Sequence, residues 1–494
     1  MSCDYHLSCT RHRTQHNLHA NGARFLDPPS HSAGIRVDLS DRMLLCASSN
    51  LRNEVIVGGS DHALYAVDIV DPSKYNNGSY KPVTMYSKTC GHTDWVTTVT
   101  HLTDGKVLSG SMDGKLCLWS EYNRSQCIEL QSPHSSHPIS KVVSDTRNNV
   151  AMSCSYDGRI SVWKFSSDDE DIYMKDGEAL EHMHSRVAKR SSTDIRSQAL
   201  HTIPLTYLSA HTEPVLDCGY HNDVLVSGDK SGSMIIWDLA TCTAKHKFRA
   251  HPGAITAVDC LDDRGTVVSA GTDGYVKVWD PRIQGSGLVA KLPSHILPAS
   301  GTSMPPPISQ RSLQTGRTSS TLNTSGRISS TTGRGRSSGD RGTGRGPRSS
   351  GQDERSTARV VSSAISTLGV VRGRGSSGDV SYIITGSGSP EDSSIAVMDV
   401  RNSFQPICRW SHQRNGVYSL CIVGEESVFS GDGVGTLLCH SLLTHELDDP
   451  RACLKYGIGA SEQGAVRSIS CINGKLVTAG EDGKVMVFDY NSLK

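Results

Sequence analysis

The sequence predicts an all-β protein made of repeated units, and three observations carry this prediction. A signature of the form Ser-Gly-Ser-x-Asp-Gly-x4-Trp runs from Ser109 to Trp119, with close copies at 153–163 and 269–279. The segments that carry it alternate apolar and polar residues, as in Lys115-Leu116-Cys117-Leu118-Trp119, which is typical of half-buried strands. Glycine is abundant, with 47 residues, and favours a turn-rich β protein over a helical bundle. Since one such unit cannot bury its own apolar face, the units must stack into one architecture.

Composition excludes several other classes of protein. Lysine plus arginine and aspartate plus glutamate each number 50, so the chain lacks the global basic field of a nucleic-acid coat. Fifteen cysteines lie mostly in apolar, strand-like runs and none forms a Cys-x-x-Cys pair, which indicates reduced thiols inside a cell. No secretory signal or membrane span is visible. We therefore expect no membrane contact and a cytoplasmic location, with nuclear or cytoskeletal locations as alternatives.

Each unit is predicted to hold an apolar strand, a second strand ending in Ser-Gly-type residues, an Asp-Gly turn and a third strand. Asp-Gly between two alternating runs indicates a hairpin, because glycine tolerates the positive φ of a tight turn. The expected third strands end at Asp68, Trp119, Trp163, Trp237, Trp279, Met398, His440 and Phe488.

These units resemble the WD40 repeat family. The resemblance rests on the signature together with Gly91-His92, Ala210-His211 and Ala250-His251 before first strands, and on Trp237-Asp238 and Trp279-Asp280 after third strands. It covers the chain from about Gly34 to Lys494, less two insertions, and implies a β-propeller of four-stranded blades.

The number of blades follows from the residues available. Setting aside residues 1–33, 166–204 and 296–378 leaves 339 residues, or about 42 per unit for eight units and about 48 for seven. The family period of about 40–45 residues favours eight blades, with seven, the commoner number, as the alternative.

The resemblance also implies a hydrogen-bonded His-Ser-Asp-Trp tetrad in each unit that retains the signature residues, since buried imidazole, hydroxyl and indole groups need partners. The expected members are His92, Ser109, Asp113 and Trp119; Ser153, Asp157 and Trp163, with His134 favoured over His137; His211, Ser227 and Trp237; and His251, Ser269, Asp273 and Trp279. Unit four has Ser231 at the Asp position, unit one has Val67 where Trp belongs, and unit eight has Phe488 there. Those three blades are expected to be held by packing more than by polar contacts.

A His-Ser-Asp set also suggests a hydrolase. The set recurs in several units, however, and a repeated Trp fits a structural role better than catalysis. At the N-terminus Cys3, His6, Cys9 and His12 are spaced too tightly for a usual zinc finger. The sequence therefore predicts a non-enzymatic protein with no catalytic residues, cofactor, metal or small-molecule substrate.

The last blade and the insertions complete the domain prediction, a propeller over 34–494. The chain ends soon after a third strand at 485–490, and we expect Ile35–Leu39 to add the missing outer strand and close the ring. Residues 1–33 are predicted to be a disordered His-rich tail and 166–204 a charged insertion. Residues 296–378 carry twelve Arg and three acids, a charge near +9, and are expected to be a disordered Ser/Gly/Arg-rich loop. Within that range, 360–371 is expected to form the first strand of unit six.

The expected function is that of a scaffold or adaptor that binds protein partners on the propeller faces, because recognition residues sit on loops of rigid scaffolds. The candidate contacts lie beside the Asp-Gly turns and after the Gly-His pairs: Trp95, Met112, Tyr156, Lys230, Thr272 and Glu481. Trp95 is the favoured anchor, with packing between blades as its alternative role. Other functions stay open: RNA association through the Arg-Gly repeats of 296–378, substrate adaptor of a ubiquitin ligase, or component of a cytoskeletal or ciliary assembly.

Overall fold

The structure of the chain is a computed structural model that describes most of the predicted repeat region. It divides into a unit of residues 1–297 and 362–494 and a second unit of residues 298–361. The described residues are 24–26, 34–50, 52–70, 80–87, 90–102, 105–120, 123–131, 134–145, 150–165, 204–283, 287–297, 361–373, 380–443, 447 and 453–490. The predictions for the His-rich tail, for 166–203 and for 298–360 therefore lie outside the described residues, apart from the short strand at 24–26.

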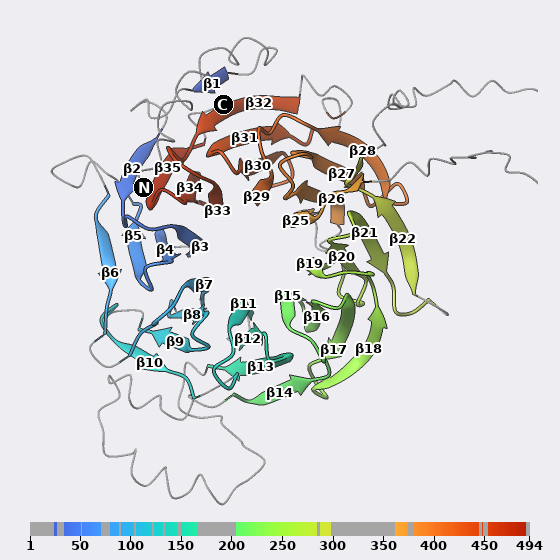
Figure 1. Ribbon diagram of the computed structural model, residues 1–494, viewed down its shortest axis with the longest axis horizontal. Coiled ribbons are helices and arrows are strands. Elements are labelled where there is room, and N and C mark those ends of the chain that lie inside the picture. Colours follow the sequence, from blue (N-terminus) through green and yellow to red (C-terminus); the bar gives the residue numbers. More distant parts are fainter. Residues whose placement is uncertain are drawn as a thin grey trace, which may run out of the picture. The chain divides into compact units, whose positions relative to one another are not determined.

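Eight antiparallel blades of four strands follow one another around a ring, and a short fifth strand, β1 (Arg24–Leu26), joins the sheet of blade seven in parallel (Figure 1). Blade one comprises β3 (Leu44–Ser49), β4 (Glu54–Gly59), β5 (Leu64–Asp68) and β6 (Pro82–Met85). Blade two comprises β7 (Val96–His101), β8 (Val107–Ser111), β9 (Leu116–Trp119) and β10 (Cys127–Glu129). Blade three comprises β11 (Ile139–Asp145), β12 (Val150–Ser155), β13 (Arg159–Lys164) and β14 (Thr206–Ser209). Blade four comprises β15 (Val215–His221), β16 (Val224–Asp229), β17 (Ser233–Asp238) and β18 (Thr243–Arg249).

The second half of the ring repeats this order until the last blade. Blade five comprises β19 (Ile255–Cys260), β20 (Val267–Gly271), β21 (Tyr275–Trp279) and β22 (Leu288–Pro293). Blade six comprises β25 (Ile365–Arg372), β26 (Val380–Ser387), β27 (Ile395–Asp399) and β28 (Gln405–Trp410). Blade seven comprises β29 (Val417–Val423), β30 (Ser427–Asp432), β31 (Thr436–Ser441) and β32 (Leu454–Gly459). Blade eight comprises β33 (Val466–Ile472), β34 (Lys475–Gly480), β35 (Lys484–Asp489) and β2 (Ile35–Asp38). Three short strands complete the set: β1 (Arg24–Leu26), β23 (Ile296–Leu297) and β24 (Val361–Ser362).

The first strand of each blade contacts the first strand of the next, and β33 contacts β3, so the inner strands close into a ring. Buried apolar residues form eight clusters, and each cluster joins two neighbouring blades. The core is therefore a series of interfaces between blades, as expected when no unit buries its own apolar face.

Polar side chains on the inner strands also tie neighbouring blades together. Every first strand has a register irregularity near its start, and in some blades a hydroxyl group there reaches the next blade. Thr97 Oγ1 donates to Ile139 O over 2.7 Å, and Ser140 Oγ donates to Val215 O over 2.7 Å. Through these bonds the Ile139 and Val215 carbonyls accept from side chains of the preceding blade.

The N-terminal strand β2 supplies the outer strand of blade eight, which confirms the predicted closure. Ile35 pairs with Val487 and Val37 with Val485 in antiparallel register. Beyond the strand, Leu39 N and Ser40 N both donate to Gly483 O, over 3.2 and 3.1 Å. Gly483 has φ +74, and a Cβ there would lie 1.9 Å from Ser40 O, so only glycine fits this contact.

The propeller has eight blades, as the residue count favoured. All eight expected third strands are present and end within one residue of the predicted positions. Strand β25 confirms the expected first strand of unit six. The predicted loop over 296–378 was too long, because residues 296–297 and 361–373 lie in strands and turns that the structure describes.

Candidate functional site

Blade two brings His92, Ser109, Asp113 and Trp119 into one buried network. His92 Nε2 lies 2.7 Å from Ser109 Oγ, and Trp119 Nε1 donates to the same hydroxyl over 2.9 Å. On the other side of the imidazole, Nδ1 lies 3.5 Å from Asp113 Oδ1. One ring nitrogen of His92 therefore faces the carboxylate and the other faces the serine, so each buried polar group has a partner.

Blades three and five repeat the arrangement. In blade three His134 Nε2 lies 2.8 Å from Ser153 Oγ, and His134 Nδ1 lies 3.2 Å from Asp157. His137 only faces the carbonyl of residue 134. The full sets are His134, Ser153, Asp157 and Trp163, and His251, Ser269, Asp273 and Trp279.

Blade four also has a complete tetrad, and here the expectation of a blade held mainly by packing was wrong. The carboxylate comes from Asp229, two residues before the Ser231 position at which Asp was sought. Asp229 Oδ2 lies 2.9 Å from His211 Nδ1, while Ser227 Oγ lies 2.7 Å from His211 Nε2 and accepts from Trp237 Nε1 over 2.8 Å. Asp229 Oδ1 also accepts from the backbone N–H groups of Ser231 and Ser233, each over 2.9 Å.

Blade six holds a related network that sequence reasoning missed. His295 lies 3.1 Å from Thr385 Oγ1 through Nε2 and 3.2 Å from Asp392 Oδ2 through Nδ1. Arg409 adds an ion pair to Asp392 at 2.6 Å. About 90 residues separate His295 from Thr385, and this separation hid the pairing. A signal was present: His134, His251 and His295 follow the preceding third-strand Trp by 15, 14 and 16 residues.

Blade seven replaces the tetrad with stacked rings and an amide. His440 stands at the Trp position and stacks on Trp410 with ring centroids 4.4 Å apart. Gln413 takes the place of the imidazole and bonds to Ser430. Asp432 accepts three backbone N–H bonds and has no histidine partner among the described residues.

Blades one and eight keep the least of the polar network. In blade one Asp61 Oδ2 accepts from Ser40 Oγ and Tyr65 Oη, each over 2.5 Å, while Val67 is fully buried. In blade eight the buried Thr478 hydroxyl has no partner among the described residues, and Phe488 is fully buried. Packing therefore dominates blade eight, as its sequence indicates.

These networks do not support hydrolase chemistry. The hydroxyls of Ser109, Ser153, Ser227 and Ser269 belong to fully buried residues, and each accepts a bond from a Trp indole. A nucleophile must reach its substrate, and these oxygens face only their own blade. Their repeated geometry is that of a structural clamp.

The electrostatics of the tetrads agree with a clamp. Burial opposes ionisation of Asp113, but hydrogen bonds from His92, Thr93 N and Lys115 N outweigh it and hold the pKa of Asp113 below its usual range. The pKa values of Asp157, Asp229 and Asp273 are lowered in the same way. Without a histidine, burial raises the pKa of Asp432. The tetrad aspartates are therefore charged acceptors, and their bonds are correspondingly strong.

All six candidate contact residues lie on one face of the ring. Five of them directly follow the second strand of a blade, and Trp95 directly precedes a first strand. In each blade the backbone N–H after the second strand donates to the carbonyl before the first: Met112 to Trp95, Tyr156 to Pro138, Lys230 to Pro214, Thr272 to Ala254 and Glu481 to Ala465, over 2.9 to 3.0 Å. This face therefore carries one equivalent loop pair from each of these blades.

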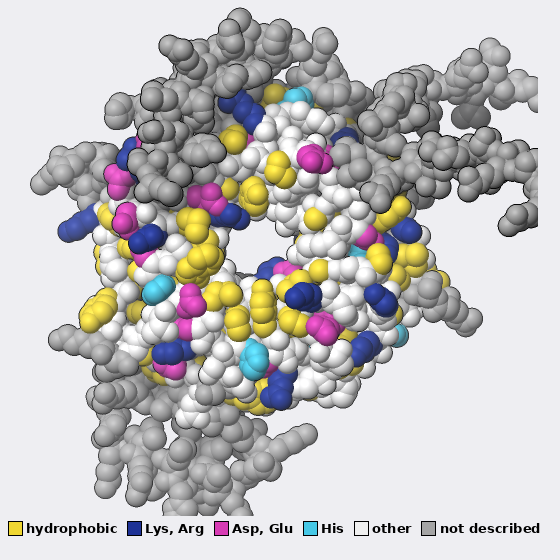
Figure 2. All heavy atoms as spheres, viewed as in Figure 1, with side chains coloured by type: hydrophobic (Ala, Val, Ile, Leu, Met, Phe, Trp, Pro, Cys, Tyr) yellow, Lys and Arg dark blue, Asp and Glu magenta, His cyan; other side chains and the backbone are white. Residues whose placement is uncertain are grey.

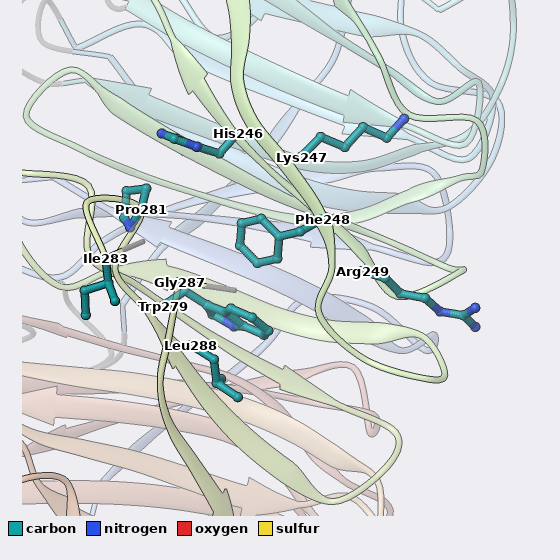
Figure 3. Close-up of a pocket in the computed structure, with 9 residues that line it drawn as sticks. All are labelled: His246, Lys247, Phe248, Arg249, Trp279, Pro281, Ile283, Gly287 and Leu288. Carbon is teal, nitrogen blue, oxygen red and sulfur yellow. The ribbon is translucent and has the colours of Figure 1, made fainter. Parts of the chain in front are cut away.

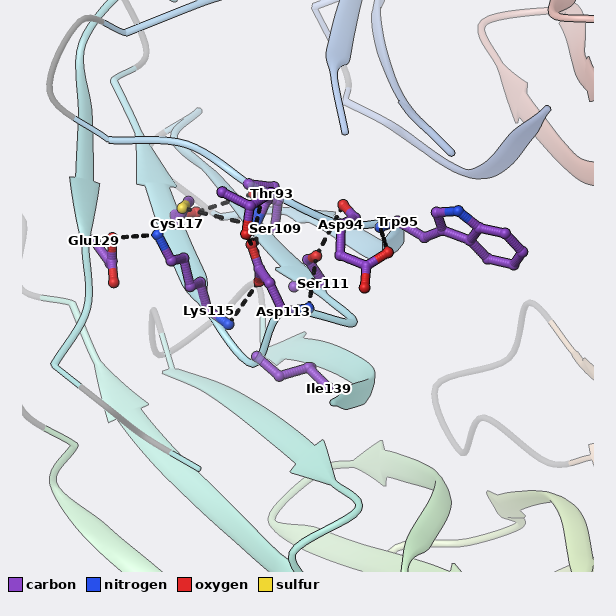
Figure 4. Close-up of polar contacts among 12 residues, drawn as sticks. Thr93, Asp94, Trp95, Ser109, Ser111, Asp113, Lys115, Cys117, Glu129 and Ile139 are labelled. Carbon is purple, nitrogen blue, oxygen red and sulfur yellow. Dashed lines mark hydrogen bonds and ion pairs between the residues drawn. The ribbon is translucent and has the colours of Figure 1, made fainter. Parts of the chain in front are cut away.

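Trp95 is held by its backbone while its side chain points away from the tetrad (Figure 4). Asp113 accepts from Thr93 N over 2.7 Å, and Ser111 Oγ donates to Asp94 O over 3.1 Å. Met112 N donates to Trp95 O over 2.9 Å. The same aspartate thus serves the tetrad and the loop, and the indole remains 46% exposed.

The other candidate contact residues differ in their solvent exposure. Tyr156 is 41% exposed, and Lys230 and Thr272 are also exposed. Met112 is half-buried beside Trp95. Glu481 is half-buried and is engaged by Arg467 and by Ala465 N. The aromatic and apolar candidates, Trp95, Met112 and Tyr156, therefore all come from blades two and three. Figure 2 shows one face of the ring with hydrophobic side chains gathered around its central opening.

The eight blades and their clamps define a repeat β-propeller, and comparison with known proteins identifies the repeat. A family model described as WD domain, G-beta repeat matches residues 83–120, 125–164, 202–238 and 242–280. The chain is a WD40-repeat β-propeller protein. The first match starts in β6 and ends after β9, so one sequence repeat spans the outer strand of one blade and three strands of the next.

Curated relatives match only part of the chain. ASTRA-associated protein 1 of Yarrowia lipolytica is 34% identical over 108 residues, which cover 21% of this chain and 25% of that protein. ASTRA-associated protein 1 of Clavispora lusitaniae is 37% identical over 75 residues, covering 15% of this chain and 20% of that protein. The matched region thus spans about a quarter or less of either relative.

Among solved structures, Sqt1 of Chaetomium thermophilum aligns with a TM-score of 0.60 at 16% identity, over 93% of this chain and 98% of that one. This likeness shows the fold alone. Within the described ranges, no helix reaches the length and hydropathy that a membrane crossing requires.

Proposed function

We propose that this protein is a non-enzymatic scaffold that binds a protein partner on the face carrying the Asp-Gly turns, with Trp95 as the anchor. The observation that carries the proposal is a half-exposed indole on a loop whose backbone is fixed by the blade-two network. A Trp side chain on a fixed backbone has only two torsions to order on binding and offers a large contact area, which is why Trp is frequent at the centres of interfaces.

Three further features support this face as the surface that binds a protein partner. Tyr156 presents a second exposed ring from the neighbouring blade, and Met112 lies beside Trp95. Every blade clamp that includes Asp113, Asp157, Asp229 or Asp273 fixes the turn next to a candidate contact. Sqt1 was crystallised with the N-terminus of ribosomal protein L10, so a propeller of this fold can hold a protein segment. That partner belongs to Sqt1 and is not assigned to this chain.

The RNA alternative rests on Arg-Gly repeats that lie outside the described residues. No described contact favours it, and the ligase and cytoskeletal roles likewise have no contact of their own. We therefore keep protein binding on the Trp95 face as the proposed function.

The experiment compares partners recovered with the intact chain, with Trp95→Ala and with Tyr207→Ala. Tyr207 is 43% exposed on the outer strand β14, so it is a matched aromatic control away from the face. We expect Trp95→Ala to lose a specific set of proteins with no change in melting temperature, while Tyr207→Ala retains them. Retention of every partner by Trp95→Ala would refute the anchor, and a large fall in its melting temperature would assign Trp95 to packing between blades.

A further inference from the structure

A groove on the side of the ring, between blades four and five, is built differently from the face described above. It is lined by His246, Lys247, Phe248, Arg249, Trp279, Pro281, Ile283, Gly287 and Leu288, with a volume of about 370 Å³ (Figure 3). One wall is the outer strand β18 and the other is the end of β21 with the start of β22. Apart from Trp279, an expected tetrad member, sequence reasoning did not single out these residues, although the run Lys245-His246-Lys247-Phe248-Arg249 alternates as an edge strand does.

The floor of the groove is apolar and rigid. Phe248 packs on Trp279 with ring centroids 4.6 Å apart. Trp279 is fixed in turn by its indole bond to Ser269 over 3.0 Å. Ile283 and Leu288 are 48% and 36% exposed at the rim, so the lining offers aliphatic surface to a ligand.

The charge of the lining is entirely basic or neutral. Lys247 and Arg249 are exposed on β18 and hold fixed positions, since Lys247 Nζ donates to Ala210 O and Arg249 donates to the carbonyls of residues 251 and 252. Asp280, which lies between the lining residues Trp279 and Pro281, is already paired with Arg282 at 2.7 Å. Fixed positive charge beside apolar surface suits a ligand that carries acidic and apolar groups together.

Strand β18 is the outer edge of its sheet, so one side of its backbone has no neighbour among the strands that the structure describes. The molecule shows that such an edge can take another strand: β1 adds to β32, the fourth strand of blade seven, in parallel register. An extended peptide could therefore gain backbone hydrogen bonds along β18. Its alternate side chains would lie on the groove side of the strand with Phe248 and on the opposite side with Lys247 and Arg249, which point away from the groove (Figure 3).

We propose that the groove between β18 and β22 is a docking site for an extended peptide that alternates acidic and large apolar residues. The site is separate from the Trp95 face and does not depend on that proposal. Single-stranded RNA fits less well, because base stacking needs open aromatic faces and Trp279 is only 6% exposed.

The test measures binding of a fluorescein-labelled eight-residue peptide of alternating Glu and Leu to the full chain by fluorescence anisotropy. The double variant Ile283→Asp/Leu288→Asp should weaken binding at least about tenfold, since it removes apolar contacts and adds charge that repels the peptide. Val83→Asp is the matched control, because Val83 is 50% exposed on the outer strand β6 of blade one. N-methylation of alternate peptide amides should also abolish binding if the peptide joins β18.

Several results would overturn the proposal. They are no binding of the Glu-Leu peptide, equal binding of a Lys-Leu peptide, an equal loss with Val83→Asp, or tighter binding of octauridylate RNA that the Ile283/Leu288 variant weakens. Trp95→Ala should leave peptide affinity unaltered, so the failure of one site is distinguishable from the failure of the other.

Discussion

Substitution of Asp229 by alanine tests whether this carboxylate is the histidine acceptor of the blade-four tetrad, although Ser231 occupies the position of Asp in the other tetrads. Asp229 is 1% exposed and accepts from His211 Nδ1, Ser231 N, Ser231 Oγ and Ser233 N over 2.7 to 2.9 Å. Its loss leaves a buried imidazole without its acceptor. Removing one member of a buried polar pair costs roughly 3–5 kcal/mol, and we expect about 4 kcal/mol here.

The expected fall in melting temperature is modest despite this energy. Unfolding entropy of about 2.1 cal/mol/K per residue, summed over the ring, converts about 4 kcal/mol into roughly 5 °C. Scanning calorimetry and urea unfolding followed by tryptophan fluorescence should give the same order of variants. Asp238→Ala is the control in the same blade, because Asp238 accepts two backbone bonds in an exposed turn, and it should cost about 1 kcal/mol or less.

A swap of the two positions sharpens the test. The double variant Asp229→Ser/Ser231→Asp gives blade four the order of residues found in blade two, where Ser111 precedes Asp113. It should recover most of the stability that Asp229→Ala loses. Equal losses for Asp229→Ala and Asp238→Ala, or a swap as unstable as Asp229→Ala, would refute the assignment of the clamp.

The remaining predictions concern closure, pH and the inner ring. Deleting residues 1–40 should lower the melting temperature more than deleting 1–33, because only the longer deletion removes β2; equal values would argue against closure by this strand. The pKa values of Asp113, Asp157 and Asp273 lie below their unfolded values of about 3.9, so their stabilisation is present above about pH 4 and is lost as pH falls further. The unfolding free energy, measured from pH 6 to pH 2, should therefore drop below about pH 4, and a flat profile would contradict the ionised clamps. Asp217→Ala removes the acceptor for Lys141 Nζ at 2.5 Å and Val258 N at 2.8 Å, and should cost about 3 kcal/mol by urea unfolding; a cost under about 1 kcal/mol would show that this link between three blades is weak.

The regular part of the fold could be predicted from the sequence because strand period and turn chemistry are local. Alternation marked the third strands, and Asp-Gly marked the hairpins. Gly114 shows the reason: it has φ +78, and a Cβ there would lie 2.6 Å from the backbone of Ser136. The closing strand was also predictable, since an incomplete last blade needs an outer strand.

Sequence analysis did not find the complete networks of blades four and six, because their members depart from the spacing between His, Ser and Asp that the other tetrads share. Asp229 reaches His211 from a position two residues earlier, because a carboxylate needs only to approach Nδ1. His295 reaches Thr385 and Asp392 across the insertion, so the two halves of one blade lie far apart in the sequence. The groove at β18 depends on two blades meeting, which no single repeat reveals.

The most direct test of the account is hydrogen–deuterium exchange of the intact chain, alone and in the complex recovered with its partners. Binding on the Asp-Gly face predicts new protection of the amides around 93–97, 111–114 and 155–157, with the outer strands unchanged. Protection confined to 245–249 and 281–289 would indicate that partners bind in the side groove and not on the Asp-Gly face. Protection at neither place would contradict the proposed scaffold surface.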